Sequence, residues 1–357
     1  MYLSDLRKRI DDIDEQITAL FSQRMEFAEK IAEYKQENNM PIFQSSREDE
    51  VLDRVSSLSP KKYQSGARLL FTNIMDISKC LQSSAVNSEF IKDIPIVEDE
   101  PNLPKVACQG VQGAYSESAC DKLFPNAQKS FCESFEEVFA AVEEGTVDFG
   151  ILPIRNSTSG EVSQTYDLMG KHNFYIHKSV EIKVNHCFCA KQGISFSEIA
   201  RVYSHEQALK QCSTFLAQNP QLLPIAYSNT AAAAKLVANS DEPIAAICSQ
   251  ECAQIYGLEI LQRGLVREDD NYTRFICIKR ELSVIKGADV ISVSLSIPNS
   301  PAALYRLLTR FAVAGLNLSR IESKPIGNRN FDVIFYLDFI GTVADKKVLL
   351  LLSGLER

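Results

Sequence analysis

Apolar residues recur three and four positions apart over residues 3–34 at the start of the chain. This spacing lines one stripe of a helix, and Pro41 lies just beyond its end, so we expect a helix over residues 3–38. At 1.5 Å per residue, that helix is on the order of 50 Å long. One charged residue, Arg24, interrupts a stripe that otherwise consists of Leu3, Leu6, Ile10, Ile13, Ile17, Leu20, Phe27, Ile31 and Tyr34.

Two shorter helices are predicted to follow. Ser45 and Glu48 form a capping-box pattern that opens the first of them. Pro60 opens the second, whose apolar stripe runs through Ala67, Leu70, Phe71, Ile74, Ile77 and Leu81. Three helices, one of them this long, do not cover the first stripe within a single chain. We therefore expect an intertwined helical dimer.

Arg24 needs an anion, because a guanidinium stays charged and loses solvation when it is buried. The anion is either a carboxylate of the protein or a carboxylate of a ligand. Lys35 lies three helical turns beyond Arg24 on nearly the same face. Further polar groups adjoin the faces that we expect to be buried, namely Arg7, Arg47, Glu48, Ser78 and Gln82.

The remaining pattern divides the chain into further domains. Residues 85–103 are rich in Ser, Glu, Asp and Pro and are predicted to be a linker. Short apolar strands then alternate with amphipathic helices over residues 104–282, which indicates an α/β domain. The last stretch has the order βαββα and stops at Arg357, one strand short of a ferredoxin-like unit. The domains are thus an all-α segment 1–84, the linker, an α/β segment 104–282 and an α+β segment 288–357.

Polar loops follow the predicted strands of the α/β segment, where open sheets of this class bind ligands. The loop 109–116 contains two glycines and enters a helix, so it is either an anion site at a helix N-terminus or a plain turn. The other loops begin at Asn156, Tyr203 and Asn271.

Composition excludes several classes of protein. A net charge of −8 and a pI near 5.3 argue against nucleic-acid binding. No apolar run approaches the ~18 residues that span a bilayer, and the N-terminus has no signal-peptide pattern. Cys187 and Cys189 lie two apart, which suits one face of a strand better than a metal site. We expect structural thiols, no bound metal and a reducing cytoplasmic location.

The first segment resembles the helical chorismate mutase family. The resemblance covers residues 3–82 and rests on residues of the stripe together with Asp14, Pro41 and the polar groups named above. It implies an intertwined three-helix dimer in which Arg7 reaches the site of the other subunit. By the same resemblance, the substrate carboxylates are held by Arg7, Arg24 and Arg47. The ether oxygen is contacted by Lys35 and Gln82. Glu48 and Ser78 contact the hydroxyl end, and Gln44 stands where many relatives have an acid.

The central segment resembles prephenate dehydratase over residues 104–282, most specifically at residues 271–275. The resemblance implies two α/β lobes with a cleft between them, in the plan of a periplasmic binding protein, and no metal or redox cofactor. Thr273 is then the hydroxyl that assists the leaving group. The implied substrate contacts are Asn156, Ser157, Ser204, Gln207 and Arg274, with a structural role for Arg274 left open. We interpret His205 as a loop histidine rather than an acid.

The central segment departs from the family pattern at three positions. Arg155 stands where an acid is usual, Glu206 where proline commonly follows the histidine, and Val111 where proline is usual. The charge reversal at Arg155 leaves two outcomes open. Either a neighbouring group compensates it, or the dehydratase is impaired.

The tail resembles an ACT domain, an amino-acid-sensing module. Residues 321–325 match its signature, with Lys324 for the usual arginine. The resemblance implies L-phenylalanine as effector, near Ala303, Leu304, Glu322 and Ser323. The run Ala302-Ala303-Leu304 stands where this loop normally has a glycine. The added methyl, with Tyr305 beside it, blocks the close approach of an effector.

Together these features predict a bifunctional enzyme of phenylalanine biosynthesis that takes chorismate to prephenate and then to phenylpyruvate. Two alternatives stay open from the residues. One is a mutase whose central domain has lost turnover, and the other is a sensor that binds aromatic metabolites without catalysis. The sensor does not explain why a full set of mutase cations precedes the cleft.

Overall fold

The computed structural model describes residues 2–38, 40, 45–85, 94–98, 101–266, 271–300, 302–325 and 333–355. The chain divides into two compact units. One contains residues 1–94 and 286–357, and the other contains residues 95–285. The first unit therefore holds the helical segment and the C-terminal α+β segment, and the second holds the α/β segment.

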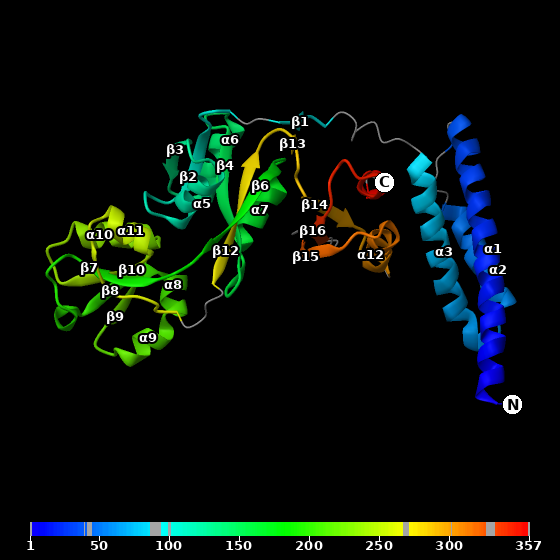
Figure 1. The fold of residues 1–357 in the computed structure, drawn as a ribbon, viewed down its shortest axis with the longest axis horizontal. Coiled ribbons are helices and arrows are strands. Elements are labelled where there is room, and N and C mark those ends of the chain that lie inside the picture. The colour runs from blue at the N-terminus through cyan, green and yellow to red at the C-terminus, as the bar shows by residue number, and fades with distance from the viewer. Residues whose placement is uncertain are drawn as a thin grey trace. The chain divides into compact units, whose positions relative to one another are not determined.

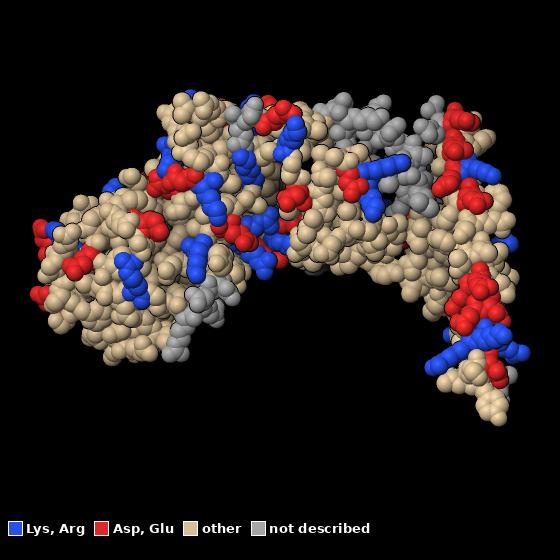
Figure 2. Space-filling model, in the orientation of Figure 1, with Lys and Arg blue, Asp and Glu red and all other residues tan. Residues whose placement is uncertain are grey.

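The helical segment has the three predicted helices. They are α1 (Leu3–Glu37), α2 (Ser45–Leu58) and α3 (Gln64–Ala85), with a short 3₁₀ turn η1 (Lys61–Tyr63) before α3. Figure 1 shows α1 as one long unbroken helix. In Figure 2 acidic and basic side chains gather in patches at the two ends of this helical segment, with mostly uncharged surface between them.

The apolar stripe of α1 is not the face that packs within the chain. Met25, Ala28 and Ala32 are the buried apolar residues of α1 among those described. The stripe itself stays open to solvent, with Leu3 64% and Leu20 65% exposed. An exposed apolar surface of this length is typical of an interaction site.

The α/β segment is built from two lobes. In the first, the strand order is β3-β2-β4-β12-β6, and β5 pairs with β4. Strand β12 is antiparallel to both neighbours, while β2 is parallel to β3 and β4. The strands are β2 (Lys105–Gln109), β3 (Gln128–Cys132), β4 (Phe149–Asn156), β5 (Gly160–Glu161), β6 (Tyr175–Lys183) and β12 (Tyr272–Lys279). The helices are α5 (Tyr115–Leu123), α6 (Phe135–Glu143) and α7 (Ser163–Lys171).

The second lobe is a five-stranded sheet of order β11-β7-β10-β8-β9. Its strands are β7 (Cys187–Ala190), β8 (Arg201–His205), β9 (Leu223–Tyr227), β10 (Ile244–Cys248) and β11 (Glu259–Gln262). Its helices are η2 (Phe196–Glu198), α8 (Glu206–Gln211), α9 (Ser213–Gln218), α10 (Thr230–Ala238) and α11 (Gln250–Ile255). The chain passes between the lobes twice, from β6 to β7 and from β11 back to β12 (Figure 1). The predicted strand for Cys187 and Cys189 is confirmed as β7.

The segment predicted as a linker contains a strand. Strand β1 (Ile96–Val97) pairs in parallel with β13 (Val284–Ile285), just before and just after the α/β lobes. The nine cysteines within the described residues are free thiols, and all but Cys132 are buried. None of the helices, over the residues that are placed, is long and apolar enough to cross a membrane.

The C-terminal segment has the predicted element order. It consists of β14 (Val290–Ile297), α12 (Ala303–Ala314), β15 (Leu318–Pro325), β16 (Val333–Ile340) and α13 (Lys346–Leu355). The three strands form an antiparallel sheet of order β14-β16-β15. Leu307 and Phe311 of α12 pack in one core with Leu337 and Phe339 of β16.

Ala302 is a strained position, because it precedes α12 in the left-handed conformation with φ 63°. That conformation is costly for a residue with a Cβ and free for glycine. We expect Ala302→Gly to stabilise this domain by about 0.5–1 kcal/mol. The gain is smaller than the strain energy that is removed, because glycine also raises the conformational entropy of the unfolded chain. Hydrogen exchange of the amides of α12 measures the effect. Ala312→Gly, at an exposed position inside α12, is the matched control and should destabilise the helix by about 1 kcal/mol.

Candidate active sites

The Arg24 guanidinium meets a neutral partner. Its Nη1 donates to Ser78 Oγ of α3 at 2.7 Å, and Ser78 donates in turn to the Ile74 carbonyl at 2.8 Å. Ser78 is 6% exposed and Arg24 is half-buried, which lowers the pKa of Arg24. Among the described residues, no carboxylate lies within ion-pair distance of Arg24. An arginine remains charged despite such a shift, so the group is available to an anionic ligand.

The acidic residue among the predicted mutase contacts, Glu48, forms an ion pair with a lysine. Glu48 of α2 lies 3.1 Å from Lys79 Nζ of α3, and Asp76 lies 2.6 Å from the same nitrogen. These side chains are partly or fully buried, so solvent ions screen their charges only weakly and the attraction between them persists. Arg47, in contrast, forms an exposed pair with Glu50 at 2.7 Å. An exposed pair of this kind contributes little and yields readily to a ligand.

The other expected mutase residues are placed less completely. Arg7 is exposed near the start of α1, and Lys35 lies in its last turn. Gln44 and the side chain of Gln82 lie outside the described residues. Arg24, Arg47, Glu48 and Ser78 are therefore the members whose partners are defined. Two of these contacts link α1 and α2 to α3.

In the α/β unit, a polar network joins the two lobes. Asn156, at the end of β4, donates through Nδ2 to Asn271 Oδ1 at 2.8 Å and to Thr273 Oγ1 at 2.9 Å. Asn271 donates to Gln211 Oε1 at 3.2 Å, and Gln211 Nε2 donates to Thr158 Oγ1 at 3.0 Å. Asn156 and Asn271 are 5% and 1% exposed. Buried amides that satisfy one another in this way hold a single geometry.

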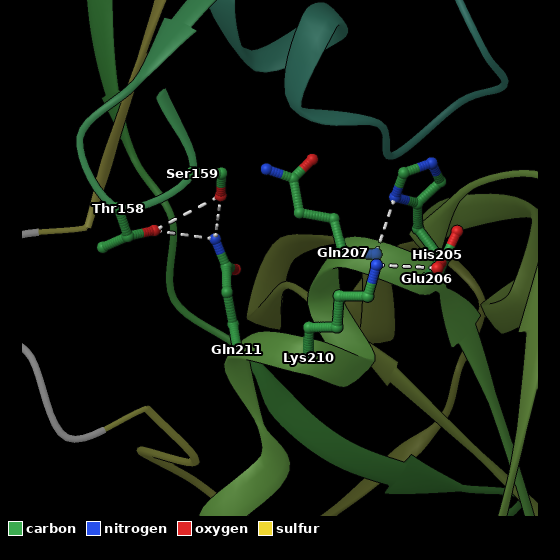
Figure 3. Close-up of a pocket in the computed structure, with 7 residues that line it drawn as sticks. All are labelled: Thr158, Ser159, His205, Glu206, Gln207, Lys210 and Gln211. Carbon is green, nitrogen blue, oxygen red and sulfur yellow. Dashed lines mark hydrogen bonds and ion pairs between the residues drawn. The ribbon is translucent and has the colours of Figure 1, made fainter. Parts of the chain in front are cut away.

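A cavity of about 580 Å³ lies beside this network. It is lined by residues of the loop after β4 and of β8 and α8, namely Thr158, Ser159, His205, Glu206, Gln207, Lys210 and Gln211. Figure 3 shows Gln211 reaching from α8 to Thr158 and Ser159, with the Gln207 side chain pointing into the space between Ser159 and His205. The volume suits a small-molecule ligand.

The expected dehydratase residues divide into three groups. Asn156 and Thr273 are bonded to each other, and Gln207 lines the cavity. Ser157 Oγ accepts the Tyr272 amide at 2.9 Å, and Arg274 donates to Ser179 at 3.3 Å, so both also tie strands together. Ser204 is fully buried and donates to the Ile247 carbonyl at 2.6 Å, which leaves its hydroxyl no exposed surface for a substrate.

His205 acts as a helix cap. It precedes α8, and its Nδ1 accepts the Gln207 amide at 3.3 Å. This contact supports the interpretation of a loop histidine, although its ring also borders the cavity.

The departures at Arg155 and Glu206 have partners of opposite charge. Arg155 Nε lies 3.6 Å from Glu161 of the paired strand β5, and Glu161 also accepts from Tyr166 Oη at 2.7 Å. Glu206 pairs with Lys210 one turn later at 2.7 Å. The charge reversal at Arg155 is therefore compensated, while Val111 packs against the apolar core of the second lobe.

The glycine loop is a turn, and the amides of both its glycines are bonded within the protein. Gly113 N–H donates to Glu117 at 2.6 Å, and Gly110 N–H donates to the Cys132 carbonyl at 2.8 Å. An added Cβ at Gly113 would lie 3.1 Å from Cys252 Sγ of α11. The plain-turn alternative thus holds, and glycine is needed for a positive φ and for close approach of the other lobe.

Gln211 and His186 belong to the network but were not predicted. Gln211 is one helical turn beyond Gln207 on α8, so periodicity offers no way to choose between them. His186 Nε2 lies 3.0 Å from Gln211 Oε1, and the ring is 2% exposed. Burial lowers the pKa of His186 to about 4, so the ring is neutral at pH 7.

The expected effector residues lie on two elements of the C-terminal segment. Ala303 and Leu304 begin α12, and Glu322 and Ser323 lie on the edge strand β15. Within the described part of the chain, no hydrogen bond joins one pair to the other.

Known families match both enzymatic segments. The sequence model for chorismate mutase type II matches residues 6–83, and that for prephenate dehydratase matches residues 106–283. The bifunctional chorismate mutase/prephenate dehydratase of Aquifex aeolicus (strain VF5) is 32% identical over 350 residues, which covers 97% of this chain and 92% of that protein. The chloroplastic arogenate dehydratase/prephenate dehydratase 2 of Arabidopsis thaliana is 37% identical over 287 residues, with 76% and 75% covered.

Solved structures also match this chain. The prephenate dehydratase of Arthrobacter aurescens, in complex with L-Phe, superposes with a TM-score of 0.64 at 28% identity, covering 71% of this chain and 86% of that one. Fold and sites thus define an enzyme that joins a helical mutase domain to a dehydratase domain of two α/β lobes. The chain belongs to the family of bifunctional chorismate mutase/prephenate dehydratases, enzymes of phenylalanine biosynthesis.

Proposed function

We propose that this chain rearranges chorismate to prephenate in its helical domain and converts prephenate to phenylpyruvate in its α/β domain. The observation that carries the proposal is the half-buried Arg24, whose described partner is the neutral hydroxyl of Ser78. An arginine kept for an internal ion pair would face a carboxylate. This one offers its charge to a ligand instead.

The first reaction is a unimolecular rearrangement, so it needs neither a nucleophile nor proton transfer. Cations hold the dicarboxylate in the reactive conformer and stabilise charge that grows on the ether oxygen. In this proposal Arg7, Arg24 and Arg47 bind carboxylates, and Lys35 with Gln82 faces the ether oxygen. Glu48, held in place by Lys79, binds the hydroxyl end together with Ser78. Gln44 completes the substrate-binding set.

The second reaction breaks two bonds of prephenate. The ring C–O bond breaks and its hydroxyl leaves as water with a proton from Thr273. The bond to the ring carboxylate also breaks and releases carbon dioxide, while its electron pair completes the aromatic ring. Solvent then returns a proton to Thr273. Threonine is a weak acid, so its position must supply most of the assistance. The proposed substrate contacts are Asn156, Ser157, Gln207 and Arg274. Ser204 is buried and has a structural role through its bond to the Ile247 carbonyl.

The exposed stripe of α1 supports a homodimer. Ile10, Ile13 and Ile17 are each more than half exposed in the single chain, over a helix of 35 residues. Covering that stripe with α1 of a second copy buries apolar surface along its whole length. Such a dimer also brings Arg7 of one subunit to the site of the other.

We further propose that the C-terminal segment is an ACT domain that binds L-phenylalanine as a feedback effector. The similar Arthrobacter aurescens dehydratase was solved with L-Phe, which supports this assignment. The C-terminal segment of this chain has the βαββα order and an antiparallel sheet, which fit the ACT class. Calorimetric titration with phenylalanine, which should release or absorb heat and alter the dehydratase kinetics, tests it.

One assay tests both catalytic assignments. The purified chain is supplied with chorismate, and prephenate and phenylpyruvate are followed separately. We expect both products to form without added metal. Prephenate alone would select the mutase with an inactive dehydratase domain, and neither product would favour the sensor.

A further inference from the structure

His186 is a buried polar group that the proposed reaction has not used. It lies in the first crossover between the lobes, immediately before β7, and its ring is 2% exposed. A polar ring so far from water needs a defined hydrogen bond. Its Nε2 has one, at 3.0 Å from Gln211 Oε1.

Backbone amides fix the polarity of the network at Asn156. Its Oδ1 receives the N–H groups of Thr158 at 3.1 Å and Ser159 at 2.9 Å. A backbone N–H only donates, so this side-chain atom must be the oxygen. The Asn156 Nδ2 is therefore the donor toward Asn271 Oδ1 and Thr273 Oγ1.

The direction of the hydrogen bond at Asn271 determines which ring nitrogen of His186 carries the proton. Since Asn271 Oδ1 accepts from Asn156, its Nδ2 donates to Gln211 Oε1 at 3.2 Å. The other end of Gln211 then donates to the hydroxyls of Thr158 at 3.0 Å and Ser159 at 3.2 Å. An acceptor at Oε1 requires that His186 Nε2 carry a proton.

The polarity decides where the Thr273 proton goes. Thr273 Oγ1 accepts from Asn156, so its proton is not used in that bond. Over the residues that the structure places, the Thr273 hydroxyl donates no hydrogen bond. With the reverse polarity, an Asn156 oxygen would face Thr273 and take the proton that the leaving group needs.

We propose that His186 is a positioning residue of the dehydratase: as the Nε2–H tautomer it holds Gln211, and through Asn271 and Asn156 it keeps the Thr273 proton pointing toward the substrate. This inference rests on the proposed role of Thr273. It predicts an effect on turnover of prephenate rather than on its binding, because none of the atoms of His186 is exposed enough to meet a ligand.

The test compares two substitutions of His186 in the full chain. His186→Leu removes the donor, and we expect kcat for prephenate to fall by about 10- to 100-fold with KM within about threefold. His186→Gln places an amide N–H near the position of Nε2, and we expect it to restore kcat to within about threefold of the wild type. Equal losses in both variants would overturn the proposal, because a purely structural role does not distinguish a donor from its absence.

A double-mutant cycle tests whether the effect passes through Gln211. In a Gln211→Met background, His186→Leu should have little further effect on kcat, and additive losses would overturn the proposal. His172→Leu is the matched control, since this half-buried histidine of the same unit lies away from the cavity. Far-UV circular dichroism and the thermal unfolding of the α/β unit report that each variant is folded. A wild-type chain without dehydratase activity would refute the proposed function, whereas an active wild type matched by His186→Leu would refute this inference alone.

Discussion

An Arg24→Met variant should lose at least about 100-fold in kcat/KM for chorismate while it still converts supplied prephenate at the wild-type rate. Methionine keeps an unbranched apolar stem on α1 but removes the charge that meets the substrate carboxylate. The two activities lie in segments matched to different families, so the loss should stay with the first reaction. Separate assays with chorismate and with prephenate measure it.

The matched control for Arg24 is Arg9→Met on the same helix. Arg9 is exposed and carries the same charge, but it is not one of the proposed contacts. We expect its mutase kinetics to stay within about twofold of the wild type, as for a surface substitution. Loss of both activities in a folded Arg24→Met protein would contradict the picture of separate sites.

Thr273→Val should lower kcat for prephenate by about 100- to 1,000-fold and leave the mutase unchanged. Valine has nearly the same shape, so it fills the space on β12 but lacks the proton donor. It also leaves Asn156 Nδ2 without the acceptor that lies 2.9 Å away. Steady-state kinetics with prephenate give the effect, and circular dichroism with thermal unfolding of the variant reports the integrity of the α/β unit.

Two companion variants isolate the hydroxyl of Thr273. Thr273→Ser retains it and should keep most of the turnover. Thr146→Val removes an exposed hydroxyl in the same lobe, bonded to the Ala141 carbonyl at 3.0 Å, and should leave prephenate kinetics unchanged. A Thr273→Val enzyme with full activity would exclude the proposed proton donor.

The sequence was a good guide wherever the determining interactions are local. The helix over Leu3–Glu37 follows from its apolar spacing, and Ser45 and Pro60 mark the following helix starts. The strand β1 could not be predicted, because it has two residues and its partner β13 lies almost 190 positions later, counted from Ile96↔Val284. Pairing at such separation is decided by tertiary packing rather than by local propensity.

The sequence predicts which types of residue belong to the site, but it does not predict which of them form hydrogen bonds with one another. Gln207 and Gln211 both project from α8, and the fold alone shows that Gln211 bridges to Thr158. The glycine loop offered an anion site in sequence, yet Glu117 supplies the carboxylate from within the protein. His186 gave no signal, because a histidine between two strands is indistinguishable in sequence from one that only fills a core.

The uncovered stripe of α1 has a consequence for how the two activities respond to dilution. If completing the mutase site requires a second copy, the fraction of competent sites follows the protomer concentration by mass action. The α/β unit has its own buried cores and no such requirement is visible in its described residues. The amount of enzyme that a cell makes would then tune the ratio of the first to the second reaction, with no effector involved.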